Sequence, residues 1–479
     1  MKSNRLTRLY KSRDLQVQRT VFGKSTKVSW IIDFAKLRPG VFVVLVFFAV
    51  ALFFTTVLML PFSSSTGQFT PFTTAFFTTT SAISGTGFQI VPTSTYWSLF
   101  GQFIIMFVIQ IGGLGIMTVA SAVALVVSKR LGLTSKILTV SDVKSSKYGE
   151  LGSLIRMIVA IVFIIEAITT AFLVPKLIEL HEGFASAIWH AVFFSVSSFN
   201  SAGFSISGIP FTQLSYHWGI VIPMFVALFI GSVGFPVMSN VIQAVKFRSL
   251  RIINLHTKVV LIMIVSLYVI LVAWFEIAEW NNVKLFTDPV LNDPIAHAAN
   301  LAMAAFVTPT AGFDTINVGS LTEPSILISE IWMFIGGAPA STCSGIKVTT
   351  LAVLLLAVWA EFRGNTDIVL FGKRLQQGAL KIAVTIFICA IGIVLVFSFL
   401  LSFLTPDVPF KVIQFDVISA FSNCGLSIGL ITHLNDAGAI WMGILMFLGR
   451  IGTMSIVSSV VKSLKNTFVR YPEENVILG

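Results

Sequence analysis

Long apolar runs alternate with short polar segments along almost the whole chain. Runs such as Val41–Leu60 and Phe103–Ser128 contain almost no charged side chain. Each is close to the roughly 20 residues needed to cross the hydrocarbon core of a bilayer. The pattern predicts eight membrane-spanning helices: Val41–Leu60, Phe103–Ser128, Met157–Val174, Ile220–Val245, Val259–Phe275, Ile326–Val358 with an interruption, Leu380–Leu404 and Ala437–Val461.

Shorter apolar pieces lie between successive pairs of these spans. They are too short to cross a bilayer and too apolar for a loop exposed to water. The sequence therefore predicts an all-α membrane protein in which a unit of helix, re-entrant half-helix with loop, and helix is used four times. The half-length pieces are Phe72–Ile83, Ala185–Phe199, Ile295–Val307 and Ile413–Phe421.

Each half-length piece is followed by a small residue, a glycine and a bulky apolar residue. The glycines recur at an almost equal spacing, as Gly87, Gly203, Gly312 and Gly425. One such glycine alone is more often a helix-packing residue. Four copies, each after a half-span, favour instead four loops that meet on one pseudo-fourfold axis.

The four loops have the properties of an ion filter. Irregular backbone at membrane depth is tolerated where it is buried in protein or lines a water-filled cavity. Half-helices that end at the axis direct their partially negative C-terminal ends towards a cation there, and loop carbonyl groups can replace its water shell. The candidate filter comprises Ser84, Gly85, Thr86, Gly87, Asn200, Ser201, Ala202, Gly203, Thr308, Thr310, Ala311, Gly312, Ser422, Asn423, Cys424 and Gly425.

Composition agrees with a membrane protein and orients it. The chain is 55% hydrophobic and 11% charged, whereas a soluble domain carries roughly 25% charged residues. The net charge of +11 does not indicate nucleic-acid binding, because most Lys and Arg residues lie in alternate segments between spans. By the positive-inside rule, this asymmetry predicts a multi-pass protein of the cell membrane, in contact with lipid, with both termini cytoplasmic.

The repeats and charges predict six regions. Residues 1–38 form a basic cytoplasmic tail, which either lies on anionic lipid or docks a partner. Residues 39–130, 131–246, 247–362 and 363–465 form the four repeats. Residues 466–479 form a cytoplasmic C-terminal tail.

A run without large side chains interrupts the span Ile326–Val358. Glycine and proline destabilise a helix there, proline by roughly 3 kcal/mol in an interior position, and a broken helix in a membrane points to a transport site. The run is either a mobile loop that gates the pore or a kink packed on a neighbour. The candidate gate comprises Gly336, Gly337, Ala338, Pro339, Ala340, Ser341, Thr342, Ser344 and Gly345, with Arg450.

Arg450 lies inside the last predicted span, where an arginine costs at least ~2.5 kcal/mol. It could hold the gate loop by hydrogen bonds to its carbonyl groups, act as an electrostatic barrier to cations, or pair with Glu330 or Asp416. Lys347 is expected to extend to the cytoplasmic interface. Glu166, in the middle of a span, is a further candidate functional residue.

Other function classes fit less well. A membrane-embedded enzyme would need a cluster of His, Asp or Glu among the spans, and a transporter of organic solutes would show inverted repeats. The cysteines and histidines have no metal-ligand spacing. The sequence therefore predicts no enzyme and no cofactor in this chain, with a small cation as the transported species.

Several stretches resemble the Trk/Ktr/HKT superfamily of potassium transporters, in particular its KtrB membrane subunits. They are Ile109–Gly115, Ala340–Lys347, Gly449–Gly452, Leu255–Lys258 and Arg470–Pro472, in addition to the four glycine loops. The resemblance covers almost the whole chain from about Leu37. One departure is Pro309, where similar proteins often have Arg, and it puts the local geometry of the third loop in question.

The resemblance implies potassium uptake through the filter, with Gly336–Gly345 as the gating loop beneath it. It also implies a homodimer with one pore per subunit, and a cytoplasmic, KtrA-like ring of nucleotide-binding regulatory subunits. No nucleotide-binding fingerprint occurs in this chain. Glycine in the first loop, Gly87, is typical of potassium-selective members. A sodium-selective or sodium-coupled transporter of the same superfamily is the alternative.

Overall fold

The computed structural model describes residues 39–131, 147–180, 183–285, 293–365, 367–375 and 378–452. The chain divides into two compact units, Ala49–Met454 and the two chain ends Met1–Phe48 and Ser455–Gly479. All four repeats have their loops in the unit Ala49–Met454. The predicted tails 1–38 and 466–479, and the end of the predicted span Ala437–Val461, lie outside the described residues.

Apolar helices account for the predicted spans. They are α3 (Pro39–Met59), α6 (Leu99–Leu131), α7 (Lys147–Glu179), the pair α10 (Trp218–Val233) and α11 (Phe235–Lys246), α12 (Leu255–Ala278), the pair α15 (Glu323–Phe334) and α16 (Val348–Phe362), α17 (Ala379–Leu404) and α19 (Asp436–Ile451). Within the described ranges, three stretches are by themselves long and apolar enough to cross a membrane: Ile155–Glu179, Leu255–Ala278 and Ala379–Leu404. The bent pair α10 and α11 passes the same test if counted as one span.

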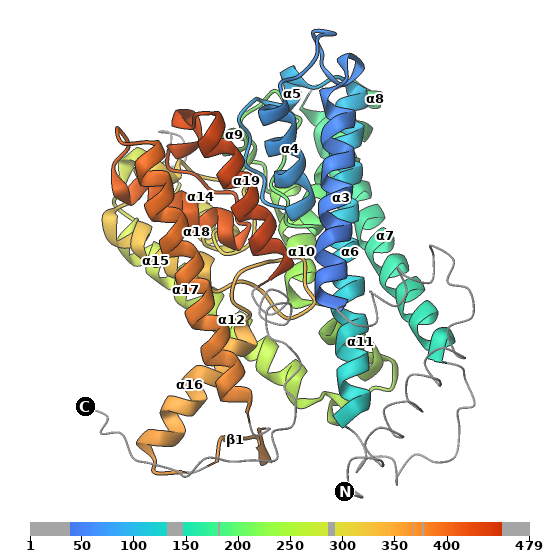
Figure 1. The fold of residues 1–479 in the computed structure, drawn as a ribbon, viewed down its shortest axis with the longest axis vertical. Helices are drawn as coiled ribbons and strands as arrows, with labels where there is room; N and C mark the ends of the chain where they lie inside the picture. Colours follow the sequence, from blue (N-terminus) through green and yellow to red (C-terminus); the bar gives the residue numbers. More distant parts are fainter. Residues whose placement is uncertain are drawn as a thin grey trace, which may run out of the picture. The chain divides into compact units, whose positions relative to one another are not determined.

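The four half-length helices form as predicted. They are α4 (Phe72–Ser84), α8 (Phe184–Phe199), α14 (Pro294–Val307) and α18 (Phe410–Ser422). Proline marks three of their N-termini, as Pro71, Pro294 and Pro409, where a missing backbone N–H costs nothing. Helix α4 of the first repeat packs on α19 of the fourth (Figure 1), so the repeats close on themselves.

Two predicted spans are less continuous than expected. The span Ile220–Val245 is broken at Gly234, where α10 and α11 meet at an angle of 102°. Gly234 has φ +84° and ψ 148°, a conformation that is almost confined to glycine, and Pro236 lies two residues further on. Helix α19 ends at Ile451, and Gly452 has the similar values φ +82° and ψ 144°. The predicted interruption of Ile326–Val358 is confirmed, since no helix lies between α15 and α16.

Short elements complete the described chain. The hairpin β1 (Val369–Leu370) and β2 (Lys373–Arg374) is antiparallel, with Val369 opposite Arg374. The short helices are η1 (Pro61–Ser63), α5 (Thr93–Tyr96), α9 (Phe211–Leu214), η3 (Leu250–Ile252), η4 (Val283–Leu285), η5 (Val318–Ser320) and η6 (Leu430–His433).

Burial follows the logic of a multi-pass membrane protein. Large apolar side chains on the spans, such as Phe172 and Leu395, are more than half exposed, whereas the polar residues Thr79 and Ser81 of α4 are completely buried. A protein in lipid needs no polar surface along its spans but must satisfy polar groups internally. The polar face of each half-helix is therefore turned to the interior, where the four loops meet.

Candidate ion filter and gate

The four repeat glycines form one closed ring in chain order. A Cβ atom added at Gly87 would collide with Ala202 O, and one at Gly203 would lie 2.6 Å from the Cα of Gly312. One at Gly312 would lie 3.0 Å from Gly425 C, and one at Gly425 would collide with Thr86 O. Each loop therefore contacts the next, and a side chain at any of the four positions would enter a neighbouring loop.

The residue before each glycine presents an unpaired backbone carbonyl group. These residues, Thr86, Ala202, Ala311 and Cys424, are completely buried. In the described part of the chain, none of the four carbonyl groups accepts a hydrogen bond. Because more than 90% of buried backbone carbonyl groups have a partner, four such groups without a donor at equivalent positions are free to bind a ligand. Oxygen atoms held in this way can coordinate a dehydrated cation.

Three of the half-helices end in the same way. Gly85, Ser201 and Asn423 adopt left-handed conformations with φ of 68°, 56° and 53°. The next residue in each loop returns its N–H to a serine carbonyl one turn back, for example Thr86 N to Ser81 O at 2.9 Å. This closing turn satisfies one of the last carbonyl groups of the helix and directs the chain across the axis.

The third loop departs from this pattern at Pro309. Helix α14 already ends at Val307, and Thr310 and Ala311 both donate to Val307 O, at 2.9 and 3.0 Å. Thr310 is not in a left-handed conformation. Proline lacks the N–H that would continue the helix, so α14 stops earlier in its repeat than α4 or α18. The geometry that the sequence put in question at Pro309 does differ.

A second repeated glycine, which the sequence analysis missed, supports the half-helix ends. Added Cβ atoms at Gly112, Gly231 and Gly449 would collide with Ile83 O, Phe199 O and Phe421 O, the corresponding carbonyl groups of α4, α8 and α18. The signal is visible in the sequence as Ile111-Gly112-Gly113, Ile230-Gly231-Ser232, Ile335-Gly336-Gly337 and Leu448-Gly449-Arg450.

The candidate gate loop is buried and docks on the second repeat. Ala338 N donates to Ser232 O at 3.0 Å and Thr342 N to Gly231 O at 3.2 Å, both at the end of α10. Phe235 N, at the start of α11, donates to Ala340 O at 3.2 Å. The break at Gly234 therefore provides the polar backbone groups that hold the loop.

Thr342 joins the gate loop to the filter. Its hydroxyl lies 3.0 Å from that of Ser201, and its carbonyl group accepts a hydrogen bond from Arg450 Nη1. The same guanidinium nitrogen lies 3.6 Å from where a Cβ of Gly85 would be. Arg450 thus lies between the first filter loop and the gate loop, at the repeat position that Gly113, Ser232 and Gly337 occupy elsewhere.

The structure shows the partners of Arg450 and Lys347. Glu330 accepts a hydrogen bond from Gln414, and Asp416 accepts from Ser427, Ile428 and Leu430. Within the described part of the chain, Arg450 pairs with neither carboxylate, so the predicted ion pairs are wrong. Lys347 does not extend away from the loop. Its Nζ donates to Cys343 O at 2.5 Å.

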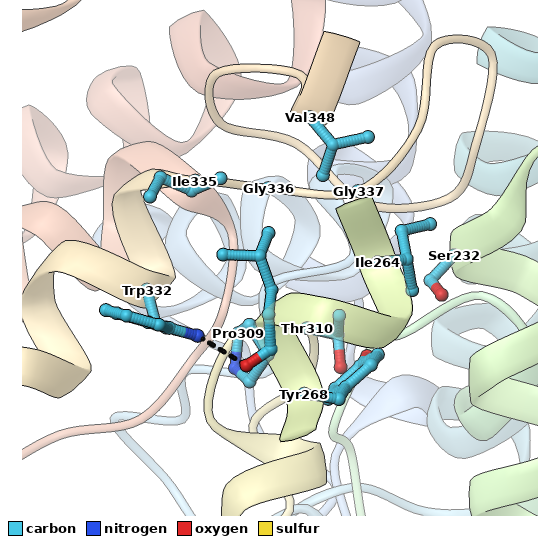
Figure 2. A pocket seen from close by; sticks show the side chains of 11 residues that line it. Ser232, Ile264, Tyr268, Pro309, Thr310, Trp332, Ile335, Gly336, Gly337 and Val348 are labelled. Carbon is cyan, nitrogen blue, oxygen red and sulfur yellow. Dashed lines mark hydrogen bonds between the residues drawn. The ribbon is translucent and has the colours of Figure 1, made fainter. Parts of the chain in front are cut away.

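A small cavity separates the gate loop from the third filter loop. Figure 2 shows Gly336 and Gly337 on one side and Pro309 and Thr310 on the other, with Tyr268 of α12 below. Its water-accessible volume of about 20 Å³ has room for about one water molecule. Trp332 Nε1 closes one wall by donating to Leu267 O at 2.9 Å.

Known proteins are similar to this chain in sequence and in fold. The model of the TrkH family, described as a cation transport protein, matches residues 40–469. The "Ktr system potassium uptake protein B" of Bacillus subtilis is 32% identical, covering 94% of this chain and 98% of that protein. The "Potassium/sodium uptake protein NtpJ" of Enterococcus hirae is 30% identical, covering 93% and 98%. The crystal structure of the potassium transporter TrkH from Vibrio parahaemolyticus superposes with a TM-score of 0.66 at 19% identity, covering 88% of this chain and 85% of that one.

The close approach at Gly449 predicts that Gly449→Ala destabilises the protein by about 2 kcal/mol, because the methyl group overpacks against Phe421 O. Thermal unfolding in detergent measures this. The matched control is Gly392→Ala in α17, where nothing lies within 4 Å and alanine favours the helix. A Gly449→Ala protein that melts no earlier than the wild type would contradict the prediction.

Proposed function

Because the chain belongs to the TrkH family of cation transport proteins, we propose that it takes up potassium across the cell membrane through the ring formed at Gly87, Gly203, Gly312 and Gly425. The observation that carries this proposal is the set of four buried carbonyl groups without a hydrogen-bond donor in the described chain. Four half-helix C-termini add negative potential at the same place. A cation completes such a site.

Potassium is favoured over sodium as the principal ion. The relatives from B. subtilis and E. hirae are named for uptake of potassium and of potassium/sodium. Glycine at all four ring positions keeps side chains out of the coordination sphere and leaves the carbonyl oxygen atoms as the ligands. A sodium-selective or sodium-coupled transporter is the second candidate, and the name of the E. hirae relative favours it.

Passage of the ion is controlled by the loop Gly336–Gly345 and Arg450. The loop is held by backbone hydrogen bonds to α10 and α11, and Arg450 ties it to the filter. Two positive charges about 4 Å apart repel by about 4 kcal/mol at an effective dielectric constant near 20. Arg450 in this position is therefore both a latch for the loop and a barrier to a cation leaving the filter.

A partner releases this latch. The relative in B. subtilis is named as one protein of a Ktr system, which supports a partner subunit. We propose that this partner is a cytoplasmic ring of nucleotide-binding regulatory subunits and that a homodimer of this chain carries it. The positive-inside distribution of Lys and Arg supports cytoplasmic termini facing such a ring.

We expect the full chain, expressed with its regulatory partner, to restore growth of potassium-uptake-deficient cells on micromolar potassium. Cation flux measured at fixed membrane potential, with and without sodium, separates uptake of potassium alone from coupled transport. Failure to restore growth, with the protein present in the membrane, would count against the proposal.

Gly87→Ser should lower the preference for potassium over sodium by at least fivefold. The serine Cβ meets Ala202 O, and Gly87 has φ +94°, so both the ring and the backbone must shift. Competition between the two ions in an uptake assay measures the preference. Gly208→Ser, at a loop glycine with nothing within 4 Å, is the matched control, and equal preference in both variants would refute the filter.

Arg450→Gln should raise potassium flux in the absence of the partner by about tenfold, since it removes the charge and weakens the contact with Thr342 O. Arg450→Lys, which keeps the charge, should stay close to the wild type. Deletion of Ala338–Ser344 should raise the flux as well. Low flux in both the glutamine variant and the deletion would show that this region is not the gate.

A further inference from the structure

A buried carboxylate lies behind the second filter loop, in a place that neither the filter nor the gate explains. Glu166 of α7 is 5% exposed. Its Oε2 accepts from Gln110 Nε2 of α6 at 3.2 Å, and its Oε1 lies 3.5 Å from Asn200 Nδ2 at the end of α8. Gln110 Oε1 in turn accepts from Asn200 Nδ2 at 2.8 Å. The three side chains close a triangle between two repeats.

The direction of these hydrogen bonds requires a carboxylate. Both oxygen atoms of Glu166 face amide nitrogen atoms, which offer them only donors. The contact with Asn200 Nδ2 is the longer of the two, because that NH₂ group also donates to Gln110 Oε1 at 2.8 Å and to Val196 O at 2.9 Å. A glutamine at position 166 would place one NH₂ group against another donor, because an amide offers only one acceptor oxygen. Gln110 cannot rotate its amide to relieve this, since its own oxygen is bound by Asn200. Glu166 fits this place because it offers two acceptor atoms, and it makes no ion pair among the described residues.

The second filter loop is the one that most needs such a support. Ser201 has φ +56°, which costs an ordinary L-residue roughly 1–2 kcal/mol. The equivalent residues Gly85 and Asn423 tolerate this conformation better, one without a Cβ and one with a short amide. A strained residue persists only where its surroundings over-determine it.

The triangle fixes the residue immediately before the strained one. Asn200 also donates to Val196 O at 2.9 Å, and Gly113, one turn beyond Gln110, has no side chain because Asn200 Oδ1 fills that space. Ser195 Oγ donates to the backbone oxygen of Glu166 at 2.6 Å, which locks α8 to α7 at the same level. The Asn200 side chain is therefore held by Gln110, by its own helix and by the backbone of α6 at Gly113.

We propose that Glu166 is a positioning residue for ion selectivity. Through Gln110 and Asn200 it holds Ser201 in its left-handed conformation, and so keeps the carbonyl oxygen of Ala202 in the ring. This inference rests on the proposed filter. It predicts that discrimination between potassium and sodium depends on a side-chain triangle that no ion touches.

The test exchanges the two ends of the triangle. Glu166→Gln and Gln110→Glu should each lower the preference for potassium over sodium at least fivefold, the first by placing two donors face to face and the second by placing two carboxylates together. The double variant restores two acceptors on one residue and a donor on the other. Its preference should return to within about twofold of the wild type.

The readout is the ratio of KM values for the two ions in uptake by the full chain with its partner, at a measured amount of protein in the membrane. The matched control is Glu330→Gln, because Glu330 is 6% exposed and accepts from Gln414 Nε2 at 3.0 Å, away from the filter loops. A structural role alone would lower the amount of protein in both glutamine variants and leave the ratio unchanged.

A wild-type ratio in Glu166→Gln, or a double variant no better than the single ones, would overturn the proposal. If the single variants fail to reach the membrane, the double variant decides. Recovery of both the amount of protein in the membrane and the KM ratio supports the triangle, and a low preference for potassium refutes it. Gly87→Ser, measured in parallel, separates the two levels. An unchanged KM ratio in Gly87→Ser would refute the proposed filter itself. A changed ratio in Gly87→Ser with an unchanged ratio in Glu166→Gln would refute only the positioning role of Glu166.

Discussion

Four buried carbonyl groups, those of Thr86, Ala202, Ala311 and Cys424, have no hydrogen-bond donor in the described chain. An unpaired carbonyl group in a membrane protein costs several kcal/mol, and a folded chain bears that cost only where something else supplies the missing partner. Most of the surrounding structure keeps these four groups close together, without a hydrogen-bond donor and buried by protein on every side except that of the axis.

The half-helices are the first of these means. Each ends just before the ring, so its last turn would compete for the loop atoms if the chain simply continued. The left-handed residues at Gly85, Ser201 and Asn423 divert the next N–H back into the helix. The loop carbonyl groups are then left without that donor. Glycines in the flanking spans, such as Gly112 and Gly449, let the helices approach closely enough to exclude other donors.

The sequence predicted the repeat, the half-helices to within a few residues and the interruption of the third repeat, because these depend on long apolar runs and on glycine spacing. It did not predict the break at Gly234. Hydropathy continues across that position, and only Gly234 with Pro236 marks the bend. The position predicted for Lys347 was also wrong, because its partner, Cys343 O, comes within reach only when the loop folds. Contacts between repeats, such as Asn423 with Thr86, have no signal in one sequence.

The structure departs from fourfold symmetry in three repeats, and the departures meet. The third repeat contributes a loop in place of a continuous helix, the second bends at Gly234 and offers Gly231 O and Ser232 O to that loop, and the fourth replaces a small residue by Arg450. The glycine positions of the second repeated motif thus serve two purposes. Where the helix continues, as at Gly112, they support the filter. Where the helix breaks, as at Gly336, or carries a charge beside the glycine, as Arg450 does next to Gly449, the motif also contributes to the candidate gate. The proposed control of passage therefore lies outside the ring that we propose selects the ion.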